Sequence, residues 1–129
     1  MSAAVKKQSA SRVPRKSRIR YEALCRCMRI AAMTVRRARW RPGNDPRDLA
    51  EGLGLRVIPS GKVRGAQIDG GALFFYHSDL LIKRNYEILH AVARFVLKEL
   101  NAEHLSAHHV ADYMSHPGIE THPQLEVVE

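Results

Sequence analysis

The 129-residue sequence has few cysteines and no long hydrophobic run, and both shortages exclude whole classes of protein. Cys25 and Cys27 lie two positions apart on an expected helix and so point to different faces, which argues against a disulfide and against a metal or redox site. No apolar stretch approaches the roughly 20 residues of a membrane span. The basic N-terminus is followed by no apolar segment of the kind that a secretory signal contains. We therefore expect a cytoplasmic protein with no membrane partner.

Acidic residues are nearly absent from the first third of the chain. Residues 1–47 hold 14 Lys and Arg against two acids, a net charge of +12, whereas residues 48–129 hold 7 against 11, a net charge of −4. A polyanion would bind the first of these two segments. Within residues 1–47 arginine outnumbers lysine by 11 to 3. This ratio favours recognition of phosphate or carboxylate, because a guanidinium group binds oxyanions through two parallel hydrogen bonds and stacks on bases.

The hydrophobic content, 45% of residues, is enough for one folded domain of modest core size with a tail on either side. Residues 1–17 contain almost nothing to bury, which predicts a disordered basic arm. Residues 117–129 contain two prolines and three glutamates but no base, which predicts a loose acidic tail. Residues 18–116 are expected to form a single domain, with a basic helix at 19–41 and a core at 45–116.

An amphipathic helix is predicted at residues 19–41. Apolar residues recur there at spacings of four, three, four and three: Leu24, Met28, Ala31, Val35 and Ala38. Arginines cluster on the opposite side, with Trp40 among them. They are either the solvated face of an ordinary surface helix or a binding surface for nucleic acid, on which Trp40 would stack on bases. The candidate binding residues of arm and helix are Arg12, Arg15, Lys16, Arg18, Arg26, Arg29, Arg36, Arg37, Arg39, Trp40 and Arg41.

The middle of the chain predicts a short helix and a small sheet. Asp45-Pro46 has the pattern of a helix N-cap with proline at the first helical position, and Gly54 ends that helix. Residues 55–58 predict a buried strand, and a hairpin follows. Its strands are expected at 66–69 and 72–76, around Gly70-Gly71, with Leu73 and Phe75 on one face and Phe74 and Tyr76 on the other. A helix, a short sheet and two further helices give an α+β domain.

The helix predicted at residues 85–98 has the outline of a zinc-peptidase helix without its zinc chemistry. In the H-E-x-x-H motif two histidines one turn apart bind the metal, and the glutamate between them acts as base on the metal-bound water. The matching positions here are His90, Ala91 and Arg94. One ligand is kept, the base is replaced by a methyl group, and the second ligand is replaced by a permanent cation that would repel zinc.

Residues 48–114 resemble the ImmA/IrrE family of small metallopeptidases, which process repressors in phage, mobile-element and stress-response systems. The similar segments, in chain order, are 48–58, 70–76, 80–85 with the His90 helix that follows, and 107–114. The resemblance implies a zincin-like fold, and it places the family's third zinc ligand, a glutamate, near Ser106. With two ligands and the base missing, it implies a degenerate member that has no peptidase activity and no zinc cofactor. If the protein is encoded by a phage, we expect to find it in the host cytoplasm or in the virion.

A histidine cluster near the C-terminal end is a candidate for a different zinc site. His104, His108 and Asp112 follow one another at intervals of four, so they share one helical face if the helix begins by Ala102. His90 would complete this site from the neighbouring helix, giving a divergent zinc metallopeptidase with His90, His104 and His108 as ligands. The alternative is that these histidines are ordinary polar surface. The site has no glutamate placed as general base.

Without zinc, the residues around His90 are expected to be structural. The core stripe of this helix is predicted to be Ile88, Leu89, Val92, Val96 and Leu100, with His90 beside it. A single histidine in such a place is usually a hydrogen-bonded structural residue. Arg94 would pair with Glu87 or with a carboxylate of the last helix, and so hold two helices together.

Three functions follow from these patterns. The leading one is a non-catalytic metallopeptidase-like module of phage or mobile-element regulation. It would bind DNA or RNA without base specificity, or a nucleoprotein partner, through its basic arm and arginine-rich helix. The second is a structural or assembly protein of a larger particle such as a virion, and the third is the divergent zinc metallopeptidase. Bound metal distinguishes the third, and salt-dependent binding of nucleic acid separates the first from the second.

Overall fold

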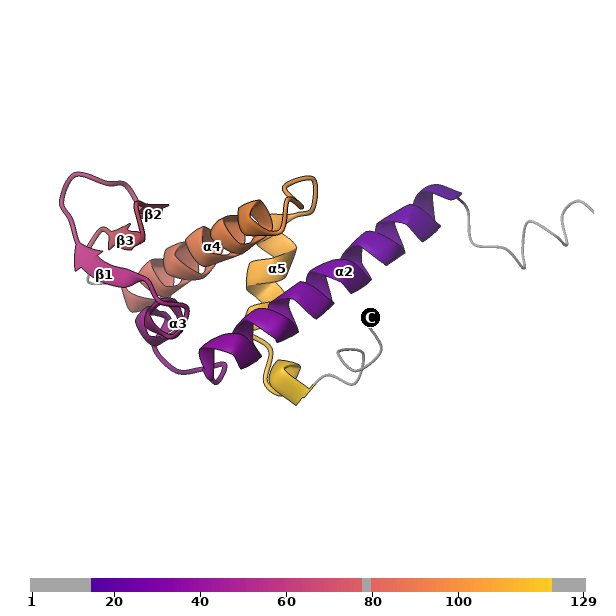
Figure 1. Ribbon diagram of the computed structural model, residues 1–129, viewed down its shortest axis with the longest axis horizontal. Coiled ribbons are helices and arrows are strands. Elements are labelled where there is room, and N and C mark those ends of the chain that lie inside the picture. Colours follow the sequence, from indigo (N-terminus) through magenta and orange to yellow (C-terminus); the bar gives the residue numbers. More distant parts are fainter. Residues whose placement is uncertain (1–14, 78–79, 122–129) are drawn as a thin grey trace, which may run out of the picture.

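A computed structural model describes residues 15–77 and 80–121, with side chains from Arg20 onward. In this part of the chain four α-helices and a three-stranded sheet form the α+β arrangement that the sequence predicts in outline (Figure 1). The elements are α2 Arg15–Ala38, α3 Pro46–Gly52, β1 Arg56–Pro59, β2 Ala66–Asp69, β3 Ala72–Phe75, α4 Leu81–Glu99, α5 Ala107–Met114 and the 3-10 helix η1 Ile119–Thr121. Residues 1–14 of the expected arm and 122–129 of the expected tail lie outside the described residues, whereas residues 15–17 of the expected arm belong to α2.

Local sequence signals account for the helix ends. The side chain of Asp45 caps α3 by accepting a hydrogen bond from the backbone N–H of Arg47 at 3.0 Å, as the sequence predicts. The helices α2, α3 and α4 are each followed by a residue of positive φ: Arg39 at 54°, Gly54 at 89° and Asn101 at 55°. The next N–H then returns to a carbonyl five residues back, for example Trp40 to Val35 at 3.1 Å. This motif ends α2 at Ala38, three residues before the predicted end.

The sheet has the strand order β1-β3-β2, with β1 parallel and β2 antiparallel to β3. The predicted hairpin is present, and its two glycines, Gly70 and Gly71, have φ of 58° and 78°, as a two-residue hairpin turn requires. Leu73 and Phe75 are buried, whereas Tyr76 is exposed, so the predicted alternation of faces also holds. Helix α4 packs against β2, and α3 packs against β1.

One hydrophobic core joins the helices to the sheet. Helix α5 lies between α2 and α4 and packs on both (Figure 1). On α2 the predicted stripe is buried from Ala31 through Ala38, while Leu24 and Met28 are half-buried. On α4 the prediction is correct for Ile88, Leu89, Val92 and Val96. It is wrong for Leu100, which is 46% exposed because it follows the last helical residue.

The packed region continues past α5. Ile119 of η1 is buried in the same core, and η1 packs on α2. Residues Ile119–Thr121 therefore belong to the folded part of the chain and not to a loose acidic tail that begins at Pro117. Among the described residues no helix has the length and the hydropathy needed to cross a bilayer.

Candidate functional site

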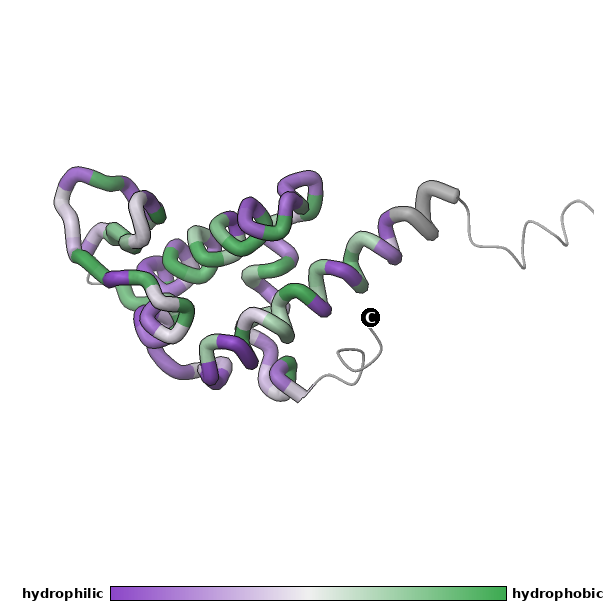
Figure 2. Tube along the Cα trace, viewed as in Figure 1, coloured by the Kyte–Doolittle hydropathy of each residue, from purple (hydrophilic) through white to green (hydrophobic). Residues whose placement is uncertain are grey.

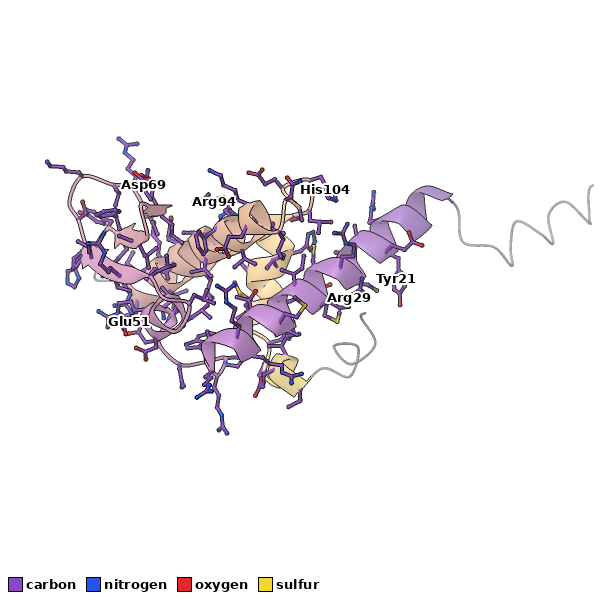
Figure 3. The ribbon with its side chains drawn as sticks, viewed as in Figure 1. Tyr21, Arg29, Glu51, Asp69, Arg94 and His104 are labelled. Carbon is purple, nitrogen blue, oxygen red and sulfur yellow. The ribbon has the colours of Figure 1, made fainter. Side chains whose placement is uncertain are left out.

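A row of arginines follows the outer side of α2 and the turn after it. We call this surface the arginine face; its members are Arg26, Arg29, Arg36, Arg37, Arg39 and Arg41. Figure 2 shows hydrophilic and hydrophobic residues interleaved along α2, as expected for a helix with one packed and one charged side. Arg29 is half-buried and the other five are exposed. Figure 3 shows Arg29 midway along α2, and Tyr21 on the part of the helix that projects beyond the other elements.

Few acids neutralise the arginine face. Arg37 Nη1 lies 3.5 Å from Glu99 Oε1, and both side chains are about half exposed, so the pair is weak. Arg26 Nη1 lies 3.3 Å from His104 Nε2, a contact that adds no negative charge. Within residues 15–77 and 80–121 no ion pair is formed by Arg29, Arg39 or Arg41. The face therefore keeps most of its positive charge.

Trp40 is buried beneath this surface and presents no open ring face for stacking. Only 4% of it is exposed, and its indole Nε1 donates a hydrogen bond to the backbone carbonyl of Asp45 at 2.9 Å. The expectation that Trp40 stacks on bases is therefore wrong for this conformation. The cause is the turn after α2: the positive φ of Arg39 directs Trp40 into the core. Of the other candidates, Arg12 lies outside the described residues, and Arg15, Lys16 and Arg18 lie in α2 with side chains that are not described.

A hollow of about 630 Å³ lies at the C-terminal end of the arginine face. Arg36, Arg39 and Arg41 line it together with Glu120 and Thr121 of η1, and buried Val35 and Trp40 form its floor. One carboxylate oxygen of Glu120 is buried and has no hydrogen-bond partner among the described residues. This hollow was not predicted from the sequence, because it depends on the packing of η1 on α2. The apolar residue Ile119 was the signal that could have indicated this packing.

The segment that resembles a degenerate zinc motif lies on α4 beside the sheet. Ala91 and Arg94 both line a groove of about 710 Å³ between α4 and β2. Arg94 Nη1 lies 3.2 Å from His90 Nδ1, and Arg94 Nη2 donates to the backbone carbonyl of Ala66 on β2 at 3.4 Å. Among the described residues Arg94 forms no ion pair with Glu87 or with α5, so the expected helix-to-helix pairing is wrong.

The surroundings of His90 disfavour a positive charge on its ring. Burial lowers the pKa of His90, and the nearby Arg94 and His108 lower it further. A neutral ring accepts the hydrogen bond that Arg94 offers to Nδ1. His90 is thus a half-buried histidine whose ring contacts a guanidinium group.

The other histidines do not share the predicted helical face. Helix α5 begins at Ala107, so His104 lies in the connection before it and contacts Arg26 instead (Figure 3). His108 does share a helical face with Asp112, and its Nε2 lies 3.3 Å from Asp112 Oδ2. Its Nδ1 lies 3.1 Å from the hydroxyl of Tyr86. In the described part of the chain no three His, Cys, Asp or Glu residues are grouped so that they could hold a metal ion.

Ser106, which the ImmA/IrrE resemblance places near the third zinc ligand, is the N-cap of α5. Its hydroxyl accepts a hydrogen bond from the backbone N–H of His109 at 3.2 Å. No protein-family model, curated protein or solved structure matches the chain. The resemblance to the ImmA/IrrE family therefore stays a prediction that rests on the residues of the sequence.

Proposed function

We propose that the protein is a non-catalytic, metallopeptidase-like module that binds nucleic acid, or a nucleoprotein partner, through the arginine face and the basic residues that precede it. The observation that carries this proposal is the arrangement of α2. One side of the helix is buried in the core, and the other side presents arginines with few acidic partners. A rigid helix that carries guanidinium groups on its open side matches the spaced charges of a phosphate backbone.

The length of the arginine face also supports a polymeric ligand. An α-helix rises about 1.5 Å per residue, so Arg26 and Arg37 are separated by about 16 Å along the axis. Phosphates of one strand follow one another about every 3.4 Å along a duplex, so the face spans several of them. Since Trp40 is buried, its ring contributes no stacking, and we propose that contact through this face is mainly electrostatic. We therefore propose binding that depends on salt and little on base sequence.

The non-catalytic part of the proposal rests on Arg94. A guanidinium group 3.2 Å from His90 places a permanent cation beside the one remaining ligand of the zinc motif. The side chain at the general-base position is the methyl group of Ala91. Ala91 and Arg94 line the groove between α4 and β2, and they provide neither a base nor a second ligand there.

The test is a pair of charge reversals measured by fluorescence anisotropy with a labelled DNA duplex. Arg37→Glu with Arg41→Glu is expected to weaken binding at least tenfold, because two contacts become repulsive. The matched control is Arg56→Glu with Lys98→Glu, which changes the net charge equally at exposed positions outside the arginine face. Equal losses in both variants would show that net charge alone governs binding, and the arginine face would then have no special role.

A second candidate is an assembly protein, and the exposed start of α4 favours it. Leu80, Leu81 and Ile82 are 65, 58 and 87% exposed, and consecutive apolar residues on a surface indicate a protein contact. If the intact protein binds neither DNA nor RNA at low salt, this candidate takes the lead. Light scattering of the wild type and of Ile82→Lys would then show whether the patch mediates self-association.

A further inference from the structure

A second cluster of cations surrounds a cavity. The segments that line it lie at the opposite end of the molecule from the projecting part of α2 (Figure 1). The cavity measures about 550 Å³ and lies between the connection from β1 to β2 and the first turns of α4. The connection contributes Lys62 and Arg64, and α4 contributes Lys83 and Arg84. Tyr76 and Glu87 complete the polar lining.

These four cations lie together although the part of the sequence that contains them has a net negative charge. Residues 48–129 contain seven Lys and Arg against 11 acids, and four of those seven line this one cavity. Glu87 is the one carboxylate among the lining residues that the structure describes. The first turn of α4 contains no acidic residue and adds the positive end of a 19-residue helix. The cavity wall is therefore positive within a half of the protein that is negative overall.

Arg84 adds a buried positive charge to the lining of the cavity. The residue is 8% exposed, and its Nη2 donates to Asn85 Oδ1 at 2.8 Å and lies 3.5 Å from Asp45 Oδ1. Asp45 makes its closer ion pair with Arg47, at 2.6 Å. The carboxylate of Asp45 is thus the counter-ion of both Arg47 and Arg84. A buried cation needs a full counter-charge, so an anion in the cavity would supply what Asp45 does not.

We propose that this cavity binds a nucleoside polyphosphate. The phosphates contact Lys62, Arg64 and Lys83, with Arg84 as the fixed donor at the wall, and the base stacks on Tyr76, which is 50% exposed. The cavity volume lies in the range of small-molecule sites. Gly65 brings the connection against the side chain of Glu87 on α4 with a φ of 79°, a conformation that favours glycine. No residue of the arginine face lines this cavity, so the inference is independent of the proposed function.

The experiment is a calorimetric titration of the full chain with ADP, with pyrophosphate and with adenosine at low salt. We expect ADP and pyrophosphate to bind and adenosine not to bind. Lys83→Glu should weaken ADP binding by about tenfold or more, because a charge-assisted contact becomes repulsive. Tyr76→Ala should weaken ADP but leave pyrophosphate unchanged. Melting temperatures like that of the wild type show that each variant is folded.

Two control variants make the test specific to the cavity. Lys98→Glu removes a lysine of α4 outside the cavity, and Arg37→Glu with Arg41→Glu removes charge from the arginine face. ADP affinity should be unchanged in both. The proposal is overturned if neither ADP nor pyrophosphate binds at millimolar concentration, or if a control weakens ADP as much as Lys83→Glu does. Its nucleotide part is overturned if Tyr76→Ala has no effect on ADP.

Discussion

Asp45 connects more elements of this protein than its place in a short turn suggests. Its side chain caps α3 and pairs with Arg47 and Arg84, and its backbone carbonyl accepts the indole N–H of Trp40. The end of α2, the start of α3 and the first turn of α4 therefore meet at one residue. The hydrogen bond from the Arg47 side chain is the main reason why the pKa of Asp45 is lowered from its ordinary value of 3.8.

This lowered pKa predicts a stability loss in acid. Because the carboxylate is favoured in the folded state, its contribution is fully present above about pH 5 and is lost as the pH falls through the folded pKa. Urea unfolding of wild type and of Asp45→Asn at pH 7, 5 and 3 measures the contribution, since asparagine keeps the cap but not the charge. The difference between the two proteins should be largest at pH 7 and smallest at pH 3. A difference that grows toward pH 3 would contradict this sign.

Arg39 holds a backbone conformation that suits glycine better. Its φ of 54° lies in the left-handed region, where a side chain costs about 1 kcal/mol or more. Arg39→Gly should therefore be more stable than Arg39→Ala by about 1 kcal/mol in denaturant unfolding. Both variants lose the same charge, so the comparison isolates the backbone. Equal stabilities would indicate that the turn after α2 relaxes when Arg39 is replaced.

At the scale of elements, one side of α2 packs on the domain and the other is open to solvent. Aspartate substitutions on the two sides should therefore have different effects on the free energy of unfolding. Val35 is fully buried, whereas Met33, two residues away, is 43% exposed. Val35→Asp should lower the free energy of unfolding by several kcal/mol, because an unpaired carboxylate would be buried. Met33→Asp should change it by about 0.5 kcal/mol or less. Similar melting temperatures for the two variants would mean that α2 does not pack on the domain in solution.

The elements that could be predicted from sequence are those with local signals. The apolar spacing of α2 and α4, the cap at Asp45 and the Gly70-Gly71 turn each depend on residues that are close along the chain. The failures involve contacts between distant segments. Arg94 was expected to pair with a carboxylate of a helix, but it donates a hydrogen bond to Ala66 on the sheet. The cations that line the cavity beside the start of α4 come from positions about 20 residues apart in the sequence. Neither arrangement has a periodic pattern that could have revealed it.

The start of α5 was misplaced for a related reason. Histidines at intervals of four suggested a helix that already includes His104, but Ser106 provides a cap three residues before His109 and sets the start at Ala107. Trp40 was assigned to the wrong side because the helix was extended past Arg39. In both cases a helix boundary moved by a few residues changed the surroundings of a candidate site residue.

At the scale of the whole molecule, the uneven charge predicts how binding responds to salt. If about six phosphates are neutralised, affinity for duplex DNA should fall by about three orders of magnitude between 50 and 200 mM salt. Deletion of residues 1–17 should reduce the slope of log K against log salt, and changes of DNA sequence should matter little. Anisotropy titrations at four salt concentrations measure both quantities. A flat salt dependence in the intact protein would assign the basic half to a protein partner.

The contact between Arg94 and β2 also bears on self-association. In the strand order β1-β3-β2 the strand β2 is an edge, and open edges pair with strands of other molecules. The backbone N–H of Tyr76 bonds the carbonyl of Gly65 at 2.8 Å, so the next carbonyl, that of Ala66, points away from β3. Arg94 Nη2 donates to this carbonyl. A strand of a second molecule that approached β2 would meet the guanidinium group of Arg94 there, so we expect this contact to disfavour edge-to-edge pairing at β2.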